Sequence, residues 1–198
     1  PEDTRGHKTE ASLRVAIHKI SSREDPDPEP LKMFIDGNTD TQFLFESYAA
    51  MARYYQMKKE NDKVMAVWEE LLAKRSDDPV VMNEYAYNVF SMEDVSRYEK
   101  AKAQAEKALA SGDENALFLG HYNIIRYYRL TKDNDTALIK YAEAAEQMPT
   151  EAFFAYGYAG VALELKKAEL YDRAIVSVKK AIEINKGRIA LIYWFNQK

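Results

Sequence analysis

The chain has no cysteine and few of the residues that interrupt helices. Its 198 residues include 7 glycines and 6 prolines. The lack of cysteine excludes disulfides, thiol catalysis and thiolate metal sites. Glycine and proline fall below their usual combined share of roughly 12%, which favours long helices, because sandwiches and barrels need many turns. No apolar stretch approaches the roughly 18 residues needed to span a bilayer.

Charge and hydrophobic content indicate a folded protein that is not a general nucleic-acid binder. Hydrophobic residues make up 46% and charged residues 30%, which suits a soluble globular chain. The net charge of −4 argues against general binding to a polyanion. Pro1 is not an initiator methionine, so any signal peptide would already have been removed. The sequence leaves the compartment of this soluble chain open between the cytoplasm and, if a signal peptide was removed, the periplasm.

The N-terminal segment differs from the rest of the chain. Apolar residues recur at helical spacing over residues 9–21, which predicts a short amphipathic helix. Prolines at alternate positions follow and predict an extended spacer. One helical turn is expected at residues 31–35. We therefore assign residues 1–38 to an N-terminal helix and spacer, and residues 39–198 to a single helical domain.

From residue 39 onward, helical periodicity alternates with short polar breaks. Helices are predicted at residues 40–59, 62–75, 79–91, 97–110, 114–130, 134–147, 150–167, 171–185 and 188–198. Thr39 and Ser96 have the spacing of a capping box. N-cap residues support five of the predicted starts: Thr39, Asp78, Ser96, Asp113 and Asp133.

Four helix pairs share one spacing of large and small residues. In the first helix, a large residue is followed three, four and seven positions later by packing residues, as at Tyr48, Met51, Ala52 and Tyr55. The same spacing begins again at residues 82, 121 and 156. The second helices share another spacing, which begins at residues 64, 101, 137 and 174. Such repetition predicts a stack of equivalent helix pairs.

The pattern is similar to that of the tetratricopeptide repeat family, whose period is about 34 residues. The resemblance implies an all-α fold, a right-handed α-α superhelix of about four repeats. Residues 188–198 would form a capping helix or begin a fifth repeat. Repeats two and four have longer turns between their two helices. The repeats are placed at residues 45–78, 79–113, 114–151 and 152–187.

The resemblance also implies that the two helices of each repeat cross closely at small residues, because small side chains let the backbones approach. His121 occupies a packing position and is expected to be buried. The small residues expected to be buried at crossings are Ala52, Ala86, Ala101, Ala137, Gly160 and Ala174.

Residues beside the packing stripe of each first helix line the inner groove in this family. In repeat four the assignment gives Phe154, Gly157, Val161 and Glu164. Arginine suits carboxylates, and tyrosine and asparagine can hydrogen-bond a peptide backbone. The alternative for the arginines is ion pairing with glutamates of neighbouring helices. The candidate peptide-binding residues are Arg53, Asn83, Tyr87, Tyr122, Arg126 and Arg129.

The sequence has no catalytic, phosphate-binding or metal-binding motif, so we expect no enzyme activity, cofactor or metal site within it. The leading hypothesis is a non-catalytic protein–protein interaction scaffold that binds a peptide segment or protein surface in its groove. Acidic segments or a C-terminal carboxylate are the expected partners, with no nucleic acid. Two alternatives remain open: self-association through residues 188–198, and a regulatory fragment of a larger enzyme or sensor.

Overall fold

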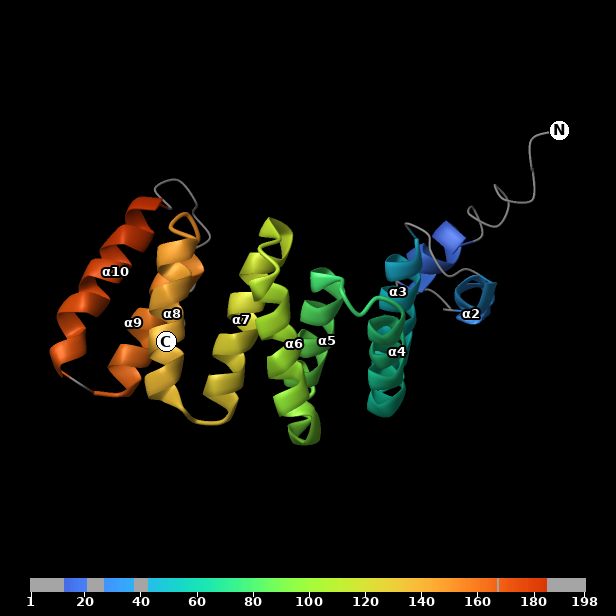
Figure 1. The fold of residues 1–198 in the computed structure, drawn as a ribbon, viewed down its shortest axis with the longest axis horizontal. Coiled ribbons are helices and arrows are strands. Elements are labelled where there is room, and N and C mark those ends of the chain that lie inside the picture. Colours follow the sequence, from blue (N-terminus) through green and yellow to red (C-terminus); the bar gives the residue numbers. More distant parts are fainter. Residues whose placement is uncertain (1–12, 21–26, 38–42, 167, 185–198) are drawn as a thin grey trace. The chain divides into compact units, whose positions relative to one another are not determined.

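A computed structural model describes residues 13–20, 27–37, 43–166 and 168–184, which contain helices and turns and no strand. The all-α prediction is confirmed for these residues. The chain divides into two compact units, Pro1–Ala116 (unit 1) and Leu117–Lys198 (unit 2), and each is described by itself (Figure 1). The domain boundary expected after residue 38 stays a prediction.

Unit 1 is built of helices that each pack on the next one along the chain. The first helical residues are 13–20, whose apolar positions Leu13, Ala16 and Ile20 are buried. The elements that follow are α2 (Glu29–Gly37), α3 (Leu44–Met57), α4 (Asn61–Lys74), α5 (Pro79–Ser91), the 3₁₀ helix η1 (Val95–Arg97) and α6 (Tyr98–Ala110).

Unit 2 begins within α7 (Glu114–Leu130) and continues the same pattern of helix pairs. Helix α9 packs on both α8 and α10. We call the first helix of each pair the A helix (α3, α5, α7, α9) and the second the B helix. Residues 188–198 lie outside the described residues. The remaining elements are α8 (Asn134–Gln147), α9 (Ala152–Glu164), the 3₁₀ helix η2 (Ala168–Leu170) and α10 (Tyr171–Ile184).

Helix α2 is longer than the single turn expected from the sequence. It runs from Glu29 and places Pro30 in its first turn, where a missing backbone N–H costs no hydrogen bond. Its apolar residues Leu31, Phe34 and Ile35 are buried, and the helix contacts α3. The expected extended spacer therefore ends before Glu29, because a proline at a helix start does not break the helix.

The predicted N-caps were right at three of the described starts. Asp78 accepts backbone N–H bonds from the first turn of α5, and Asp113 and Asp133 do the same for α7 and α8. The capping box at Ser96 is wrong: Ser96 donates to Asp94, and α6 begins at Tyr98. Helix α3 begins at Leu44, later than predicted, and Thr39 lies outside the described residues.

Each A helix ends in a turn with one residue in the left-handed conformation. In the first of these turns, the Glu60 N–H donates to the carbonyl of Tyr55 at 3.0 Å, which closes a Schellman motif. None of the four residues is a glycine, so this conformation could not be predicted from residue type. The left-handed residues are Lys59, Glu93, Lys132 and Lys166, and 34 residues separate the first two and again the last two.

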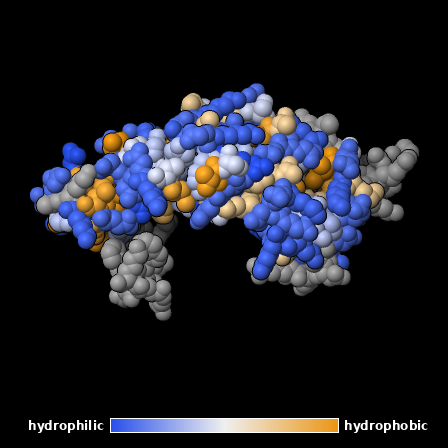
Figure 2. Space-filling model, turned by 90° about the horizontal axis from the view of Figure 1, so that it is seen from below, coloured by the Kyte–Doolittle hydropathy of each residue, from blue (hydrophilic) through white to orange (hydrophobic). Residues whose placement is uncertain are grey.

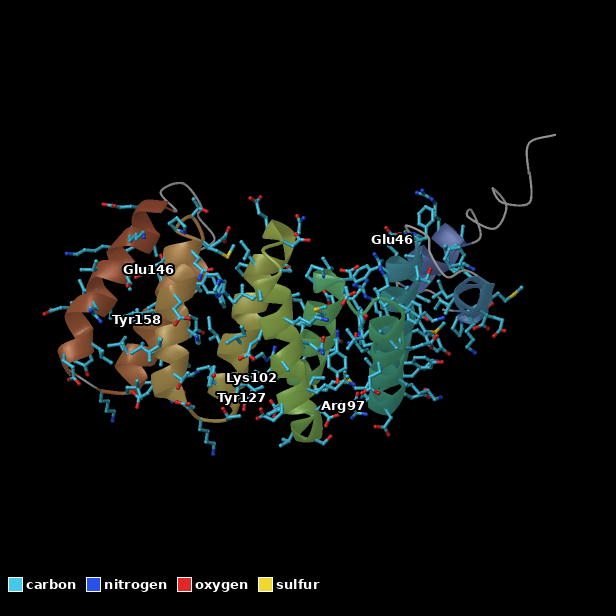
Figure 3. The ribbon with its side chains drawn as sticks, in the orientation of Figure 1. Glu46, Arg97, Lys102, Tyr127, Glu146 and Tyr158 are labelled. Atoms are coloured by element: carbon cyan, nitrogen blue, oxygen red, sulfur yellow. The ribbon has the colours of Figure 1, made fainter. Side chains whose placement is uncertain are left out.

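The longer turns expected in repeats two and four are confirmed as short 3₁₀ helices. Element η1 precedes α6, and η2 precedes α10. At the end of η1, Arg97 (labelled in Figure 3) forms ion pairs with Glu69 of α4 and with Asp94. These bonds hold the inserted turn against the preceding B helix.

Small residues are buried between helices at five of the six predicted positions. Ala52, Ala86, Ala101, Ala137 and Ala174 are all buried. The sixth position, Gly160, is exposed, and a Cβ added there would meet no atom within 4 Å outside its own helix. The prediction for Gly160 was therefore wrong.

The error at Gly160 is a shift of one residue in the alignment of repeat four. The buried residues of α9 include Ala155, Tyr158, Ala159 and Ala162, at the same spacing as Met82, Tyr85, Ala86 and Val89 of α5. Ala159, not Gly160, therefore takes the small-residue position. Tyr158 is labelled in Figure 3. Leu163, expected to pack in the core, is 61% exposed.

Gly157, three residues before Gly160, is the position where α9 approaches a neighbouring side chain too closely for a Cβ. A Cβ on Gly157 would overlap the ring of Tyr141 on α8. Tyr141 is partly buried and packs against two apolar clusters of unit 2. Gly157 therefore lets α9 lie directly on that ring, in the role that the sequence had given to Gly160.

Candidate binding surface

The corrected alignment changes which residues of α9 face solvent. Phe154 and Val161, expected to line the inner groove, are buried, with Phe154 0% exposed. In their place a line of four residues reaches the surface, with Phe153 43% and Leu163 61% exposed. We call this line the α9 face: Phe153, Tyr156, Gly160 and Leu163.

Aromatic rings join the α9 face to helix α7. The Phe153 ring lies 5.8 Å from the rings of both Phe118 and Tyr122, measured between centroids. The buried Phe154 ring lies beneath, 5.2 Å from Phe118. Ring pairs at these distances stabilise one another beyond the area they bury. Two successive A helices of unit 2 therefore present one aromatic surface held by a buried ring.

Arg126 belongs to the same surface and is positioned by Tyr122. Its Nη1 donates a hydrogen bond to the Tyr122 hydroxyl at 3.1 Å, and its guanidinium lies 6.0 Å from the centre of that ring. Residues four apart share a helix face, so the contact is local to α7. The sequence had assigned both residues to the candidate site, and the structure brings them together.

Arg129 follows the alternative that the sequence left open. Its Nη1 pairs with a Glu164 carboxylate oxygen of α9 at 2.6 Å and donates to Asn134 at 2.9 Å. These bonds tie α7 to α9 and to the start of α8. The charge of Arg129 is thus balanced by Glu164 within unit 2. Arg129 is therefore not proposed as a residue that binds an acidic partner.

In unit 1, two of the three candidate residues are at the surface. Arg53 on α3 is exposed, and Tyr87 on α5 is 38% exposed. Glu46 and Gln56 of α3 are exposed as well. Unlike the α9 face, this side of α3 exposes charged and amide side chains.

Asn83 is in the interior of unit 1. Its side chain is buried, and its Nδ2 donates to the backbone carbonyl of Ala116 at 2.9 Å. A buried amide that bonds to backbone serves packing rather than recognition. Phe90, which lies seven residues further along α5, is also buried. Asn83 is therefore omitted from the proposed surface.

His121 is buried beside the aromatic rings, as the sequence predicted. Its Nε2 lies 3.1 Å from Oε1 of Gln147 on α8, and its ring is 5.9 Å from that of Phe154. Burial lowers the pKa of His121 below its ordinary value of 6.5, while the hydrogen bond to Gln147 opposes this and raises it. On α8, Glu143 raises and Lys140 lowers this pKa.

We expect unit 2 to lose stability as the pH falls from about 7.5 to about 5.5. The unfolded chain binds a proton at His121 near its ordinary pKa, while the folded chain resists it, so acid favours unfolding. Urea unfolding followed by circular dichroism at several pH values measures the effect. His121→Gln, which removes the buried titrating group, should flatten the pH dependence. An unaltered pH dependence in His121→Gln would contradict this prediction.

Two kinds of feature are absent from the described residues. No three His, Cys, Asp or Glu side chains in residues 13–20, 27–37, 43–166 and 168–184 lie together in a group that could hold a metal ion. Among the helices of the same residues, none combines the length and the apolar character needed to cross a bilayer.

Comparison with known proteins supports the fold. A MamA structure from Desulfovibrio magneticus RS-1 is 13% identical, with a TM-score of 0.66 over 92% of this chain and 97% of that one. PilF of Pseudomonas aeruginosa is 16% identical, with a TM-score of 0.64 over 91% and 76%. A further MamA crystal structure has a TM-score of 0.65 at 13% identity and covers 87% and 95%.

No family model matches the sequence, and no curated protein matches it. MamA and PilF are both tetratricopeptide repeat proteins. At 13–16% identity the likeness speaks for the fold alone. It agrees with the four helix pairs, with the left-handed residue that ends each A helix, and with the small residues buried at the crossings. The chain has the fold of a tetratricopeptide-repeat solenoid.

Proposed function

We propose that the chain is a non-catalytic scaffold that binds a segment of another protein on the exposed faces of its A helices. Solenoids of stacked helix pairs offer long surfaces of this kind. The observation that carries the proposal is the surface of α7 and α9, where Tyr122 and Phe153 are in contact and Arg126 is held by Tyr122. Aromatic and arginine side chains are enriched where proteins bind one another.

The partner segment is proposed to carry Asp, Glu or a C-terminal carboxylate. Arginine binds carboxylates through two parallel hydrogen bonds. Arg53 and Arg126 occupy the same position in repeats one and three, and Tyr87 occupies it in repeat two. Each unit would thus contribute its own recognition residues. The alternative of self-association through residues 188–198 concerns residues that are not described, and it stays a prediction.

Replacing Arg53 and Arg126 together by alanine should weaken binding of an acidic partner at least roughly tenfold. Each lost charged hydrogen bond is expected to cost about 1.5–3 kcal/mol, and about 1.4 kcal/mol is a factor of ten in affinity. Titration calorimetry of the native chain and the double variant measures the change. Arg173→Ala, at an exposed position of the B helix α10, is the matched control.

Equal binding by the native chain and the double variant would contradict the acidic preference. Thermal unfolding of the double variant should match that of the native chain, which separates loss of recognition from loss of fold.

A further inference from the structure

Helix α10 of unit 2 has an apolar stripe that is exposed. Tyr171, Ile175 and Ile182 lie at spacings of four and seven residues, which places them on one side of the helix. Ile175 is 51% and Ile182 is 50% exposed. Apolar residues (orange) also reach the surface at the α9–α10 end in Figure 2. Because apolar surface is costly to leave in water, we expect another element to cover this side of α10.

The equivalent positions of two other B helices are packed where an A helix follows. The two isoleucines of the stripe lie one and eight residues after the start of the B-helix spacing. In α4 the same positions hold Met65 and Leu72, which are buried, and α4 packs on α5. In α8 they hold Leu138 and Ala145, which pack into the two apolar clusters that α8 shares with α9. The stripe of α10 is therefore the side on which a following A helix would pack.

The segment that follows α10 lies outside the described residues and has the sequence of such a helix. Equivalent residues of α8 and α10 are 37 apart along the chain, as Ala137 and Ala174 are. The same interval after Ala152, where α9 begins, leads to Ile189. Residues 189–198 are then equivalent to the first ten residues of α9, and their first seven residues are all apolar or aromatic.

The side chains of this segment match those that pack between α8 and α9. Phe154 of α9, in one of the shared clusters, corresponds to Leu191, and Tyr158, in the other, corresponds to Phe195. All four are large, and the two residues of the segment lie four apart, on one side of a helix. A helix in this register would therefore turn one apolar side toward α10.

The position of closest approach is matched in size as well. On α8 the large Tyr141 ring lies against Gly157 of α9, where a Cβ would overlap it. The corresponding pair is Val178 of α10 and Trp194. The larger side chain thus changes from the B helix to the following segment. A large side chain that faces a smaller one lets two packed layers interdigitate, whichever layer carries the large one.

We propose that residues 188–198 pack on α10 in the way that α9 packs on α8. Leu191 lies against Ile182, and Phe195 lies against Ile175. The occupant is this segment of the same chain, because its first apolar residue follows α10 after four residues, as α9 follows α8. So short a connection gives the segment an effective concentration at the stripe that a second copy in dilute solution does not reach. The inference goes beyond the proposed function and assigns these residues to the protein's own fold rather than to self-association.

The test uses the fluorescence of Trp194 in the full chain. The only other tryptophan is the buried Trp68, so the difference between a chain and its Trp194→Phe form isolates the signal of residue 194. Packed on α10, Trp194 should emit at short wavelength and resist quenching by iodide. Ile182→Asp places a charge in the stripe and should give emission at longer wavelength with several-fold stronger quenching. Val176→Asp adds the same charge on another side of α10 and should leave both unchanged.

Three outcomes would overturn the inference. Free quenching of Trp194 in the native chain would show that the segment does not pack. Protection that survives Ile182→Asp, or that is lost equally in Val176→Asp, would show that the stripe does not hold the segment. Protection that is lost on dilution, together with a fall in mass by light scattering, would show that a second copy covers the stripe. Protection that is independent of concentration and is lost in Ile182→Asp alone supports the inference.

The fold of the variant can be checked independently. Ile182→Asp should keep most of the helical circular dichroism of the native chain, because the side chain that it replaces is half exposed. Ile175→Asp disrupts the same stripe two turns away and should release Trp194 in the same way. Matching shifts in the two variants separate release of the segment from a local defect at residue 182, and a shift in only one of them would contradict the inference.

Discussion

Phe154→Ala is expected to lower the free energy of unfolding of unit 2 by about 3–5 kcal/mol. The Phe154 side chain is fully buried and packs with Ile125 of α7 and Ala144 of α8. Its ring also contacts those of Phe118 and His121. Alanine would leave a cavity where three helices meet, and the surrounding rings could fill it only in part. Urea unfolding followed by circular dichroism measures the loss.

The neighbouring Phe153→Ala is the matched control. Phe153 is 43% exposed, and although its ring also contacts the buried Phe154 ring, its removal leaves no enclosed cavity, so its loss should cost about 1 kcal/mol. The pair of variants tests the alignment of repeat four, since the alignment expected from sequence placed Phe154 in the groove. Equal losses from the two variants, or a larger loss from Phe153→Ala, would contradict the corrected alignment.

Gly157→Ala is expected to destabilise unit 2 by about 1–3 kcal/mol, and Gly157→Leu by more. The added Cβ would occupy the space of the Tyr141 ring, which is itself partly buried between α7, α8 and α9. The ring or the helix must move, and either movement disturbs a close-packed interior. The usual gain of a helix when alanine replaces glycine is too small to offset this.

Gly160→Ala provides the opposite result three residues away. Its Cβ meets open space, so the variant should gain about 0.5–1 kcal/mol from helix propensity alone. Tyr141→Leu removes the ring that the new Cβ of Gly157→Ala would overlap. In a double-mutant cycle, Gly157→Ala should therefore lower the free energy of unfolding less in the Tyr141→Leu background. An undiminished cost in the Tyr141→Leu background would show that the strain at Gly157 has another source.

The helices from α3 to α10, and the exact starts of α5, α7, α8 and α10, could be predicted from the sequence alone. Periodicity places a helix wherever one side is apolar and the other polar, and α5, α7 and α8 were predicted with the observed boundaries. Asp78, Asp113 and Asp133 act within a few residues of the chain, so local sequence was enough to identify them as caps. The burial of small residues in repeats one to three, and of Ala174 in repeat four, followed from the resemblance to the tetratricopeptide repeat family.

The alignment of repeat four depended on contacts between helices, which residue spacing alone does not reveal. Helix α9 is apolar on every side, so no contrast between its sides marks the buried one. The choice between Gly157 and Gly160 as the glycine of close approach depended on where the Tyr141 ring of another helix lies. Such a contact joins residues distant in sequence, and a single helix pattern carries no information about it.

The same limit applies to the candidate site. The sequence identified Tyr122 and Arg126, which share one helix face and contact each other. It could not separate them from Arg129, whose charge is paired with Glu164 of the next A helix. Nor could it show that Asn83 is buried against the carbonyl of Ala116. Spacing determines which side of a helix a residue occupies, but its exposure and its ion pairs depend on the helices packed beside it.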